Sequence, residues 1–254
     1  MKNISRRNMI QMSGLSAVGS LMGSPAFTKA SGKDKSSGNK LRIIVAGAHP
    51  DDPESGCGGT MALFASKGYE VVSAYLTRGE AGISGKSHEE AARIRTDEAL
   101  KACKILNARA EFLGQIDGST EITKDRYSEM FNFLERENPA IVFTHWPIDS
   151  HRDHRICSIL VYDAWISLGK KFALYYYEVE SGFQTQNFFP SEYIDIGPAI
   201  TQKTAACMAH ASQNPEDWYV NIHRRMEQFR GMEFNCGYAE AFVRHNLNPE
   251  TLIP

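Results

Sequence analysis

A group of charged and metal-binding side chains follows directly after the first strongly apolar run of the chain. Residues 41–46 (LRIIVA) are typical of a buried β-strand, and residues 48–52 (AHPDD) then bring one imidazole and two carboxylates. In open α/β sheets, ligands bind beyond the carboxyl ends of the strands. Pro50 has a fixed φ and no N–H group, so we expect it to end the strand and to delay the next helix. Residues 48–52 are therefore predicted to form a stiff polar loop at the edge of a sheet.

The rest of the chain alternates between apolar β-branched runs and segments with helical periodicity. After glycines at 56–60 that let the backbone pass close to the loop, helices are predicted at residues 61–67, 87–106, 124–137, 154–168, 203–212 and 221–233. Further strands are predicted at residues 70–76, 110–113, 139–145 and 172–179. This order predicts an α/β fold with a Rossmann-like, mostly parallel sheet and helices on both faces. The 254 residues, 42% of them hydrophobic, suffice for a single such domain over residues 41–254.

The first 30 residues differ from this pattern. They contain lysine and arginine but no acid, and Arg6 and Arg7 directly precede a mildly apolar stretch. This arrangement resembles the twin-arginine export signal of bacteria, which predicts a periplasmic or extracellular protein. The stretch is too short and too rich in glycine and serine for a stable membrane span. Residues 31–40 are predicted to be a flexible linker. A disordered basic tail is the alternative interpretation of residues 1–30.

Charge and cysteine content exclude several other classes of protein. The net charge is −2, and the body of the sequence has no basic stripe, so a nucleic-acid partner is not expected. The five cysteines are an odd number and have no close pairs. They therefore predict neither a disulfide framework nor a zinc-thiolate site, and we interpret most of them as buried small apolar residues.

A second polar loop, residues 146–155 (WPIDSHRDHR), follows the strand predicted at 139–145. Parallel strands have their carboxyl ends on one edge of the sheet, so the two loops are expected to meet. His49, Asp52 and His154 then supply two imidazoles and one carboxylate, which is the ligand set of a catalytic zinc site with an open position for water. A similar set also serves Fe²⁺.

We assign one further histidine to this site and interpret four others as unrelated to it. His151 is one helical turn from His154, so both rings can face the same point. Asp153 is expected to hold an imidazole in one tautomer. The isolated histidines are interpreted as ordinary core or surface residues: His88, His145, His223 and His245.

Together these motifs resemble the PIG-L/LmbE-like zinc-dependent deacetylases. The resemblance covers six segments, residues 48–60 (AHPDDPESGCGGT), 77–82 (TRGEAG), 93–107, 151–155 (HRDHR), 203–213 and 237–242. The first and the fourth segment are highly specific when found together. The resemblance implies a Rossmann-like fold and removal of an N-acetyl group from an N-acetylglucosamine-type sugar or glycan.

The resemblance also implies a role for each site residue. The implied zinc ligands are His49, Asp52 and His154. Asp51 becomes the general base, and His151, with Asp153 beside it, stabilises the oxyanion or donates a proton. Arg78 matches a position that the family often uses near sugar hydroxyls.

The expected chemistry is amide hydrolysis. Zinc lowers the pKa of its bound water towards ~7 and polarises the carbonyl group. Asp51 takes the proton of the water, and protonated His151 stabilises the tetrahedral oxyanion.

Other functions stay open at this point. A deacylase acting on a non-sugar amide could use the same residues. A metal-dependent phosphoesterase would need more bridging carboxylates than the sequence offers, and a non-catalytic zinc- or sugar-binding protein would not need Asp51 beside a ligand. A homo-oligomer also stays open. An aromatic group after the last predicted strand could be a sugar-binding wall, although we prefer to interpret it as core: Phe183, Phe188, Phe189, Tyr193 and Trp218.

Overall fold

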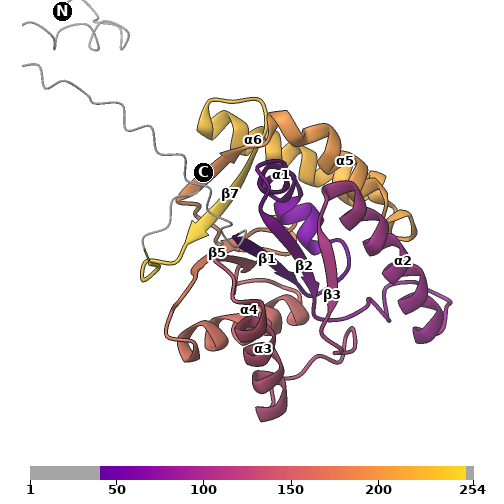
Figure 1. Cartoon of the computed structure of the whole chain (residues 1–254). Helices are drawn as coiled ribbons and strands as arrows, with labels where there is room; N and C mark the ends of the chain where they lie inside the picture. The colour runs from indigo at the N-terminus through magenta and orange to yellow at the C-terminus, as the bar shows by residue number, and fades with distance from the viewer. Residues whose placement is uncertain (1–40, 250–254) are drawn as a thin grey trace, which may run out of the picture. The chain divides into compact units, whose positions relative to one another are not determined.

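The computed structural model describes residues 41–249, which form one seven-stranded sheet flanked by helices. The strands are β1 (Arg42–Gly47), β2 (Glu70–Tyr75), β3 (Arg109–Phe112), β4 (Ile141–His145), β5 (Ala173–Tyr177), β6 (Glu192–Asp195) and β7 (Ala239–Arg244). Their spatial order is β3-β2-β1-β4-β5-β7-β6. The first five strands are parallel, whereas β7 is antiparallel to both β5 and β6. The predicted Rossmann-like, mostly parallel sheet is confirmed (Figure 1).

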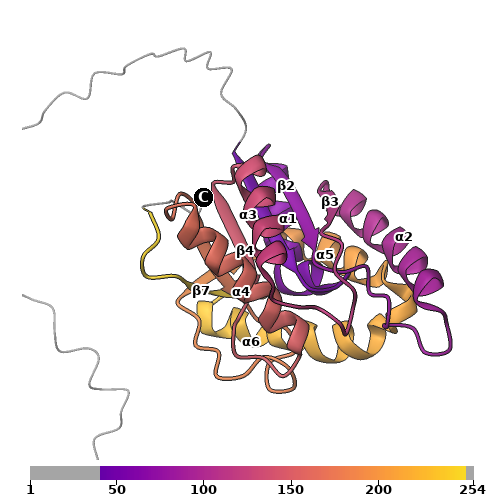
Figure 2. The ribbon, with the colours of Figure 1, turned by 90° about the horizontal axis from the view of Figure 1, so that it is seen from below.

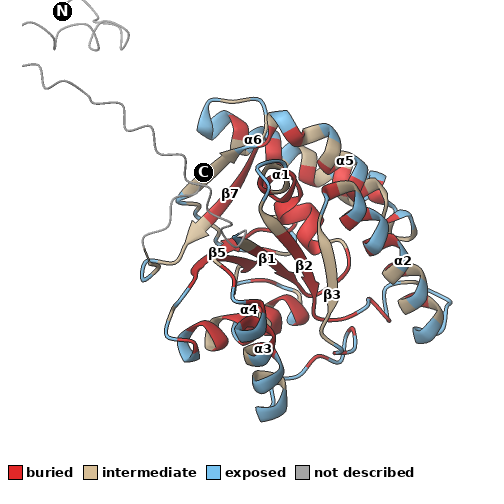
Figure 3. Cartoon of the chain, in the orientation of Figure 1, coloured by how far each residue is buried: buried red, intermediate tan, exposed pale blue. Residues whose placement is uncertain are grey.

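Helices cover both faces of the sheet. The α-helices are α1 (Asp52–Ser66), α2 (His88–Leu106), α3 (Lys124–Glu137), α4 (Arg152–Ser167), α5 (Ile200–Met208) and α6 (Arg224–Phe234). Helices α3 and α4 pack on one face, and α1 and α5 lie on the other (Figures 1 and 2). Successive side chains of β1 alternate between two cores, with Ile44 in the core under α3 and α4 and Ile43 in the core under α1. The central strands are accordingly buried on both sides (Figure 3).

Helix α1 begins much earlier than the sequence predicted. We expected a loop through residue 60, but the helix starts at Asp52, directly after Pro50 and Asp51. Pro53 occupies the first turn of the helix, where its missing N–H group breaks no helical hydrogen bond.

The glycines of α1 allow close helix packing and do not mark a loop. A Cβ atom at Gly56 would lie 2.2 Å from the Tyr177 ring, and one at Gly59 would lie 2.6 Å from Ile196. Glycine is therefore needed at both positions for the helix to approach β5 and the segment after β6.

The sequence did not predict β6 and β7. Strand β6 has only four residues and lies at the edge of the sheet with half-exposed side chains, and Glu240 and Arg244 interrupt the apolar pattern of β7. The closing helices also differ from the prediction, because a π-helical segment over Glu216–His223 leads directly into α6.

The predicted export signal at residues 1–30 and the linker at 31–40 lie outside the described residues, as do residues 250–254. Within residues 41–249, no helix has the length and apolar character needed to cross a membrane. The five cysteines are free thiols, and four of them are buried.

Candidate active site

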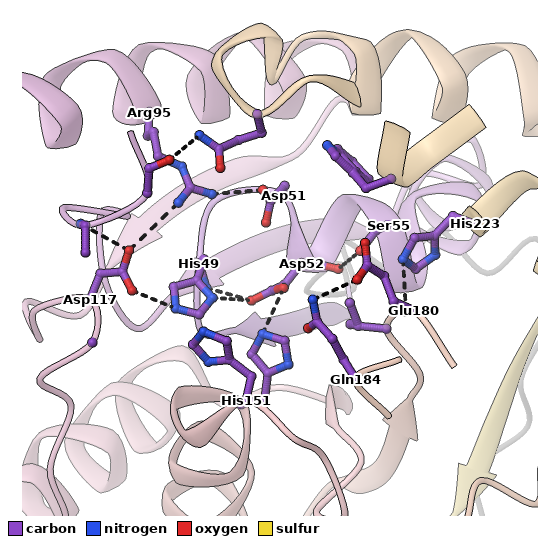
Figure 4. A pocket seen from close by; sticks show the side chains of 17 residues that line it. His49, Asp51, Asp52, Ser55, Arg95, Asp117, His151, Glu180, Gln184 and His223 are labelled. Carbon is purple, nitrogen blue, oxygen red and sulfur yellow. Dashed lines mark hydrogen bonds and ion pairs between the residues drawn. The ribbon is translucent and has the colours of Figure 1, made fainter. Parts of the chain in front are cut away.

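The two polar loops meet at the carboxyl ends of the neighbouring strands β1 and β4, beside a cavity of about 470 Å³ (Figure 4). The cavity is lined by His49, Asp51, Asp52, Ser55, Ala81, Gly82, Arg95, Asp117, Gly118, His151, His154, Val179, Glu180, Gln184, Gln213, Trp218 and His223. The sequence placed His49, Asp51, Asp52, His151 and His154 at one site, and the structure brings them together. Asp153 lies directly behind them.

Asp52 lies at the centre of a buried cluster of imidazoles. Its Oδ2 is 3.3 Å from His49 Nδ1, and its Oδ1 is 3.3 Å from His154 Nε2. All three residues are at least 94% buried, with exposed fractions of 6%, 4% and 2% for His49, Asp52 and His154. Two imidazoles and a carboxylate therefore converge from the N-terminus of α1 and the first turn of α4.

Each of these imidazoles has a carboxylate behind it. His49 Nε2 lies 3.3 Å from Asp153 Oδ2 and 3.2 Å from Asp117 Oδ1. His154 Nδ1 lies 3.3 Å from Asp149 Oδ1. A carboxylate that accepts a hydrogen bond from one ring nitrogen fixes the tautomer of the ring, so that the lone pair of the other nitrogen faces the cluster. Metal-binding histidines in proteins usually have such a partner. The donor set and its support therefore fit a metal ion.

The protonation of the cluster is consistent with a cation site. Burial alone would raise the pKa of Asp52, but the neighbouring His154 ring holds it well below its usual value. Burial opposes the charge of His154, yet Asp52 and Asp149 raise its pKa to about 9. The pKa of His49 is also raised, because Asp117, Asp153 and Asp52 outweigh its burial. Without a metal, these carboxylates are thus balanced by protons that a metal ion would displace.

His145 was interpreted as an isolated residue, and this interpretation is wrong. Its ring stacks on that of His154 with centroids 4.0 Å apart, and its Nε2 lies 3.2 Å from Asp52 Oδ2. The Ala48 N–H donates a 3.0 Å hydrogen bond to the same nitrogen. Burial and the neighbouring His154 lower the pKa of His145 to about 4, so the ring is neutral. The sequence did contain a signal for this role, because His145 is the last residue of β4 and the end of that strand was already assigned to the site.

His151 is positioned to act as a neutral hydrogen-bond donor. It is the N-cap of α4, and its Nδ1 accepts a 3.2 Å hydrogen bond from the Asp153 N–H. The proton of the neutral ring is therefore on Nε2. Burial, together with His49 and His154, lowers the pKa of His151. This lowered pKa favours a neutral ring with an N–H group at the cavity over the imidazolium that the sequence predicted.

The carboxylate of Asp153 supports His49 and does not bond to the ring of His151. The Thr120 hydroxyl and the Gly118 N–H also donate to it. Burial would raise the pKa of Asp153, but these donors and His49 hold it below the usual range. The imidazole that Asp153 fixes is therefore that of His49.

Asp51 differs from its neighbour Asp52 in conformation and in partner. Its φ is 113°, which is rare for any residue except glycine. Its Oδ2 lies 2.8 Å from Arg95 Nη2. Burial raises the pKa of Asp51, and Arg95 opposes this shift. The two adjacent aspartates thus turn to different partners, Asp52 to the imidazoles and Asp51 to Arg95 (Figure 4).

Arg95 is the arginine of this cavity, and Arg78 is not. Arg95 is buried in α2, and its Nη1 lies 3.9 Å from Asp117 Oδ2. Gly79 and Gly82 make room for it, because a Cβ at either position would come within 2.4 Å of Nη1. The guanidinium group of Arg78 instead lies over the Phe112 ring, 5.5 Å from its centroid, outside the cavity. The sequence placed Arg95 on a helix but gave no sign that its side chain turns inward.

The wall opposite the cluster was also missed. It consists of Glu180, Gln184, Trp218 and His223, from the segment after β5 and the π-helical segment. His223 Nε2 accepts a 3.2 Å hydrogen bond from the Glu180 N–H, and burial lowers the pKa of His223 to about 3. His223 is therefore a neutral part of the wall and not an isolated histidine.

The aromatic group in this region divides into three parts. Trp218 lines the cavity, whereas Phe183 and Phe189 are 70% and 79% exposed. Tyr193 lies in β6 and stacks on Phe234. The preferred interpretation of this group as core is therefore wrong for the two exposed phenylalanines.

Comparison with known proteins finds a family match over nearly half of the chain. Residues 44–165 match the family model described as PIG-L, GlcNAc-PI de-N-acetylase. This chain carries a PIG-L domain. It is 29% identical over 193 residues to the diacetylchitobiose deacetylase of Thermococcus kodakarensis, covering 69% of this chain and 71% of the relative. The 4-oxalmesaconate hydratase of Pseudomonas putida is 28% identical, covering 67% of this chain and 73% of the relative.

Solved structures share the fold of the PIG-L domain. The N,N'-diacetylchitobiose deacetylase of Pyrococcus horikoshii superposes with a TM-score of 0.71 at 22% identity, covering 83% of this chain and 87% of that one. The family model and the relatives that are deacetylases place the protein among the metal-dependent deacetylases, which are hydrolases.

Proposed function

We propose that this protein is a zinc-dependent hydrolase that removes the N-acetyl group from an N-acetylglucosamine-type sugar or glycoconjugate. The observation that carries the proposal is that two adjacent aspartates have different partners. Asp52 lies among the imidazoles, and Asp51 lines the same cavity while bonded to Arg95. Metal-dependent amide hydrolysis uses both a metal site and a separate base, and the deacetylases among its relatives support this choice.

The residues that would hold the metal are His49, Asp52 and His154. Among the described residues, three groups have ligand atoms within 4.8 Å of one another, and each shares one or two residues with this set: His49, His151 and His154; Asp52, His145 and His154; and His49, Asp117 and Asp153. Because the first group joins His151 to two of the proposed ligands, His151 is the residue whose role most needs a test. When bound, zinc, or Fe²⁺ in the same site, supplies a Lewis acid that polarises the amide carbonyl and lowers the pKa of water.

The chain's own residues provide the proton transfers. The Asp51 carboxylate accepts a proton from the attacking water, and its raised pKa makes it a better base than an ordinary aspartate. Arg95 holds this carboxylate in place. The Nε2–H of His151 donates a hydrogen bond to the developing oxyanion. Asp51 then returns its proton to the departing amine, which gives acetate and a free amino sugar.

The sugar would occupy the remainder of the cavity, against the wall that Trp218 and Glu180 form. Indole rings stack on apolar surfaces, and carboxylates accept hydrogen bonds from hydroxyl groups. Arg95 and Asp117 add further polar groups near the reacting end.

The alternative to deacetylation is the hydration of a carboxylated substrate, because one of the relatives of this chain is a hydratase. A carboxylated substrate needs cationic partners. Among the described residues that line the cavity, Arg95 is the only lysine or arginine, and it is already bonded to Asp51. Four carboxylates line the same cavity, those of Asp51, Asp52, Asp117 and Glu180. This charge balance favours an uncharged sugar.

The test is an activity assay with metal analysis on the same purified sample. N-acetylglucosamine, N,N'-diacetylchitobiose, a chromogenic phosphate ester and an unsaturated dicarboxylate serve as substrates. We expect equal amounts of acetate and free amine from an N-acetyl sugar, and about one zinc per chain. Phosphate release or hydration by the metal-loaded protein, without acetate release, would contradict the proposal.

We also propose that the protein is exported through the twin-arginine route, on the basis of Arg6 and Arg7. Replacing both with lysine should leave a precursor in the cytoplasm, as detected by fractionation and immunoblotting. If the processed form still appears outside at the normal rate, the export proposal is wrong.

A further inference from the structure

Glu54 is a buried carboxylate immediately behind the site, and the proposed reaction leaves it without a role. It lies in the first turn of α1 and is 0% exposed. Its Oε2 accepts a 3.2 Å hydrogen bond from the Asp51 N–H. Its Oε1 accepts hydrogen bonds from the hydroxyls of Tyr75 and Ser73. A carboxylate in such a place is tolerated only when it is well paired, so these contacts define one orientation of the group.

A buried histidine completes the surroundings of Glu54. His210 is 0% exposed, and its Nε2 lies 3.4 Å from Glu54 Oε2. Burial would lower the pKa of His210, but Glu54 and Asp51 raise it. Glu54 is thus held from β2 by Tyr75 and from the end of α5 by His210. Its oxygen Oε2 has a fixed place beside the backbone of Asp51.

Asp51 needs such support because its backbone is strained. A non-glycine residue at φ 113° is strained, and this conformation persists only where the surroundings enforce it. Glu54 holds the N–H of Asp51, and the Ser55 N–H donates a 2.8 Å hydrogen bond to its carbonyl oxygen. Both peptide groups of the strained residue are therefore fixed.

This arrangement differs from an ordinary helix cap. A glutamate at the third helical position often bonds to the N-cap N–H, but that N-cap residue has an extended backbone. Asp51 and Glu54 occupy the two positions of a capping box, but here the N-cap residue has a positive φ, the glutamate is fully buried, and the N-cap side chain also bonds to Arg95 in another helix.

We propose that Glu54 is a positioning residue for Asp51. Its carboxylate holds the Asp51 backbone in the strained conformation, and this directs the Asp51 carboxylate towards Arg95 and the cavity. The inference rests on the proposed function, since it takes Asp51 as the base of the deacetylase reaction. A displacement of a catalytic group by about 1 Å can lower the rate ~10²-fold. A side chain at position 54 that is too short to contact the Asp51 N–H should therefore lower kcat.

Two variants at position 54 separate the effect of side-chain length from the effect of the negative charge. Glu54→Asp keeps the carboxylate but shortens the side chain by one methylene group, which withdraws it from the Asp51 N–H. Glu54→Gln keeps the length, and its amide oxygen can still accept from that N–H while its NH₂ donates to the Tyr75 hydroxyl. Tyr75→Phe is the control, because it removes a buried hydrogen bond from Oε1 and leaves the contact between Oε2 and Asp51.

We expect Glu54→Asp to lower kcat by ~10- to 100-fold with KM and zinc content little changed. Glu54→Gln and Tyr75→Phe should keep kcat within about threefold of the parent, even where they lower the melting temperature. In the Asp51→Asn background the effect of Glu54→Asp on kcat should shrink to less than about threefold, because the group that Glu54 positions is gone.

Equal losses for the Asp and Gln variants, or a loss that persists in the Asp51→Asn background, would overturn the proposal. Crystal structures of both variants provide a readout that does not depend on activity. The Asp51 φ should stay positive in Glu54→Gln and leave this region in Glu54→Asp. If the parent protein hydrolyses no N-acetyl sugar, the proposed function fails, and these two φ angles alone decide whether Glu54 positions Asp51.

Discussion

The two sides of the cavity are built in different ways. The cluster side takes its central residues from two short segments, at the ends of β1 and β4, and backs each imidazole with a carboxylate. The opposite wall takes Glu180 from the segment after β5 and Trp218 from the π-helical segment. The first side is dense, buried and charged, whereas the second consists of side chains brought from distant parts of the chain.

This difference indicates which side performs which task. Ligands and a base must be held tightly in a fixed geometry, and strand ends provide such rigid positions. Residues that select the substrate can come from loops and helix ends, which differ between proteins of one fold. Changes on the cluster side should therefore act on metal content or kcat, and changes on the opposite wall should act on KM.

The largest effect on turnover is expected for Asp51→Asn. The variant removes the base but no metal ligand, so kcat should fall by ~10²- to 10⁴-fold while zinc stays bound. Steady-state kinetics on an N-acetyl sugar measure this loss. A variant with normal turnover would mean that another group takes the proton.

His151→Ala should have a smaller effect on the same side. Loss of one hydrogen-bond donor to the oxyanion is expected to lower kcat by ~10²-fold, with most of the zinc retained. Kinetics and metal analysis of the same preparation check this. A metal-free His151→Ala protein would instead make His151 a ligand.

On the opposite wall, Trp218→Ala should raise KM by about tenfold and change kcat by much less. The indole contact should stabilise the bound substrate and the transition state equally, so its loss weakens binding without raising the barrier of the bound complex. Kinetics with N,N'-diacetylchitobiose measure the two constants separately. A fall in kcat at constant KM would show that the two sides are not separate in function.

Arg78→Ala should have the smallest effect. Its guanidinium group lies over Phe112 outside the cavity, so we expect kcat/KM within about twofold of the parent. A tenfold loss would show that the substrate extends beyond the cavity to this arginine.

The cluster side could be predicted from sequence because its residues are adjacent in sequence. An imidazole and two carboxylates directly after a buried strand are visible as a motif, and the parallel topology brings the second loop to them. The start of α1 was misplaced because Pro50 and the glycines resemble loop residues, although Pro53 suits a first helical turn and the glycines serve close packing.

The cavity residues that lie outside the two sequence motifs could not be predicted in the same way. Arg95 lies on a helix whose apolar stripe gives no sign of a buried arginine, and its slot depends on Gly79 and Gly82 in another segment. His145 ends a strand that is otherwise almost entirely apolar, and the packing of its ring on His154 shows that it belongs to the cluster. Such contacts form between elements that are distant in sequence, so local patterns do not show them.

The most direct test of this account is the zinc content of Asp51→Asn and Asp52→Asn, measured by mass spectrometry after dialysis. Neighbouring aspartates with different roles should give opposite results. Asp51→Asn should retain about one zinc per chain, and Asp52→Asn should lose most of it and recover part of its activity when zinc is added. A metal-free Asp51→Asn protein beside an Asp52→Asn protein that keeps its zinc would contradict the assignment of ligand and base.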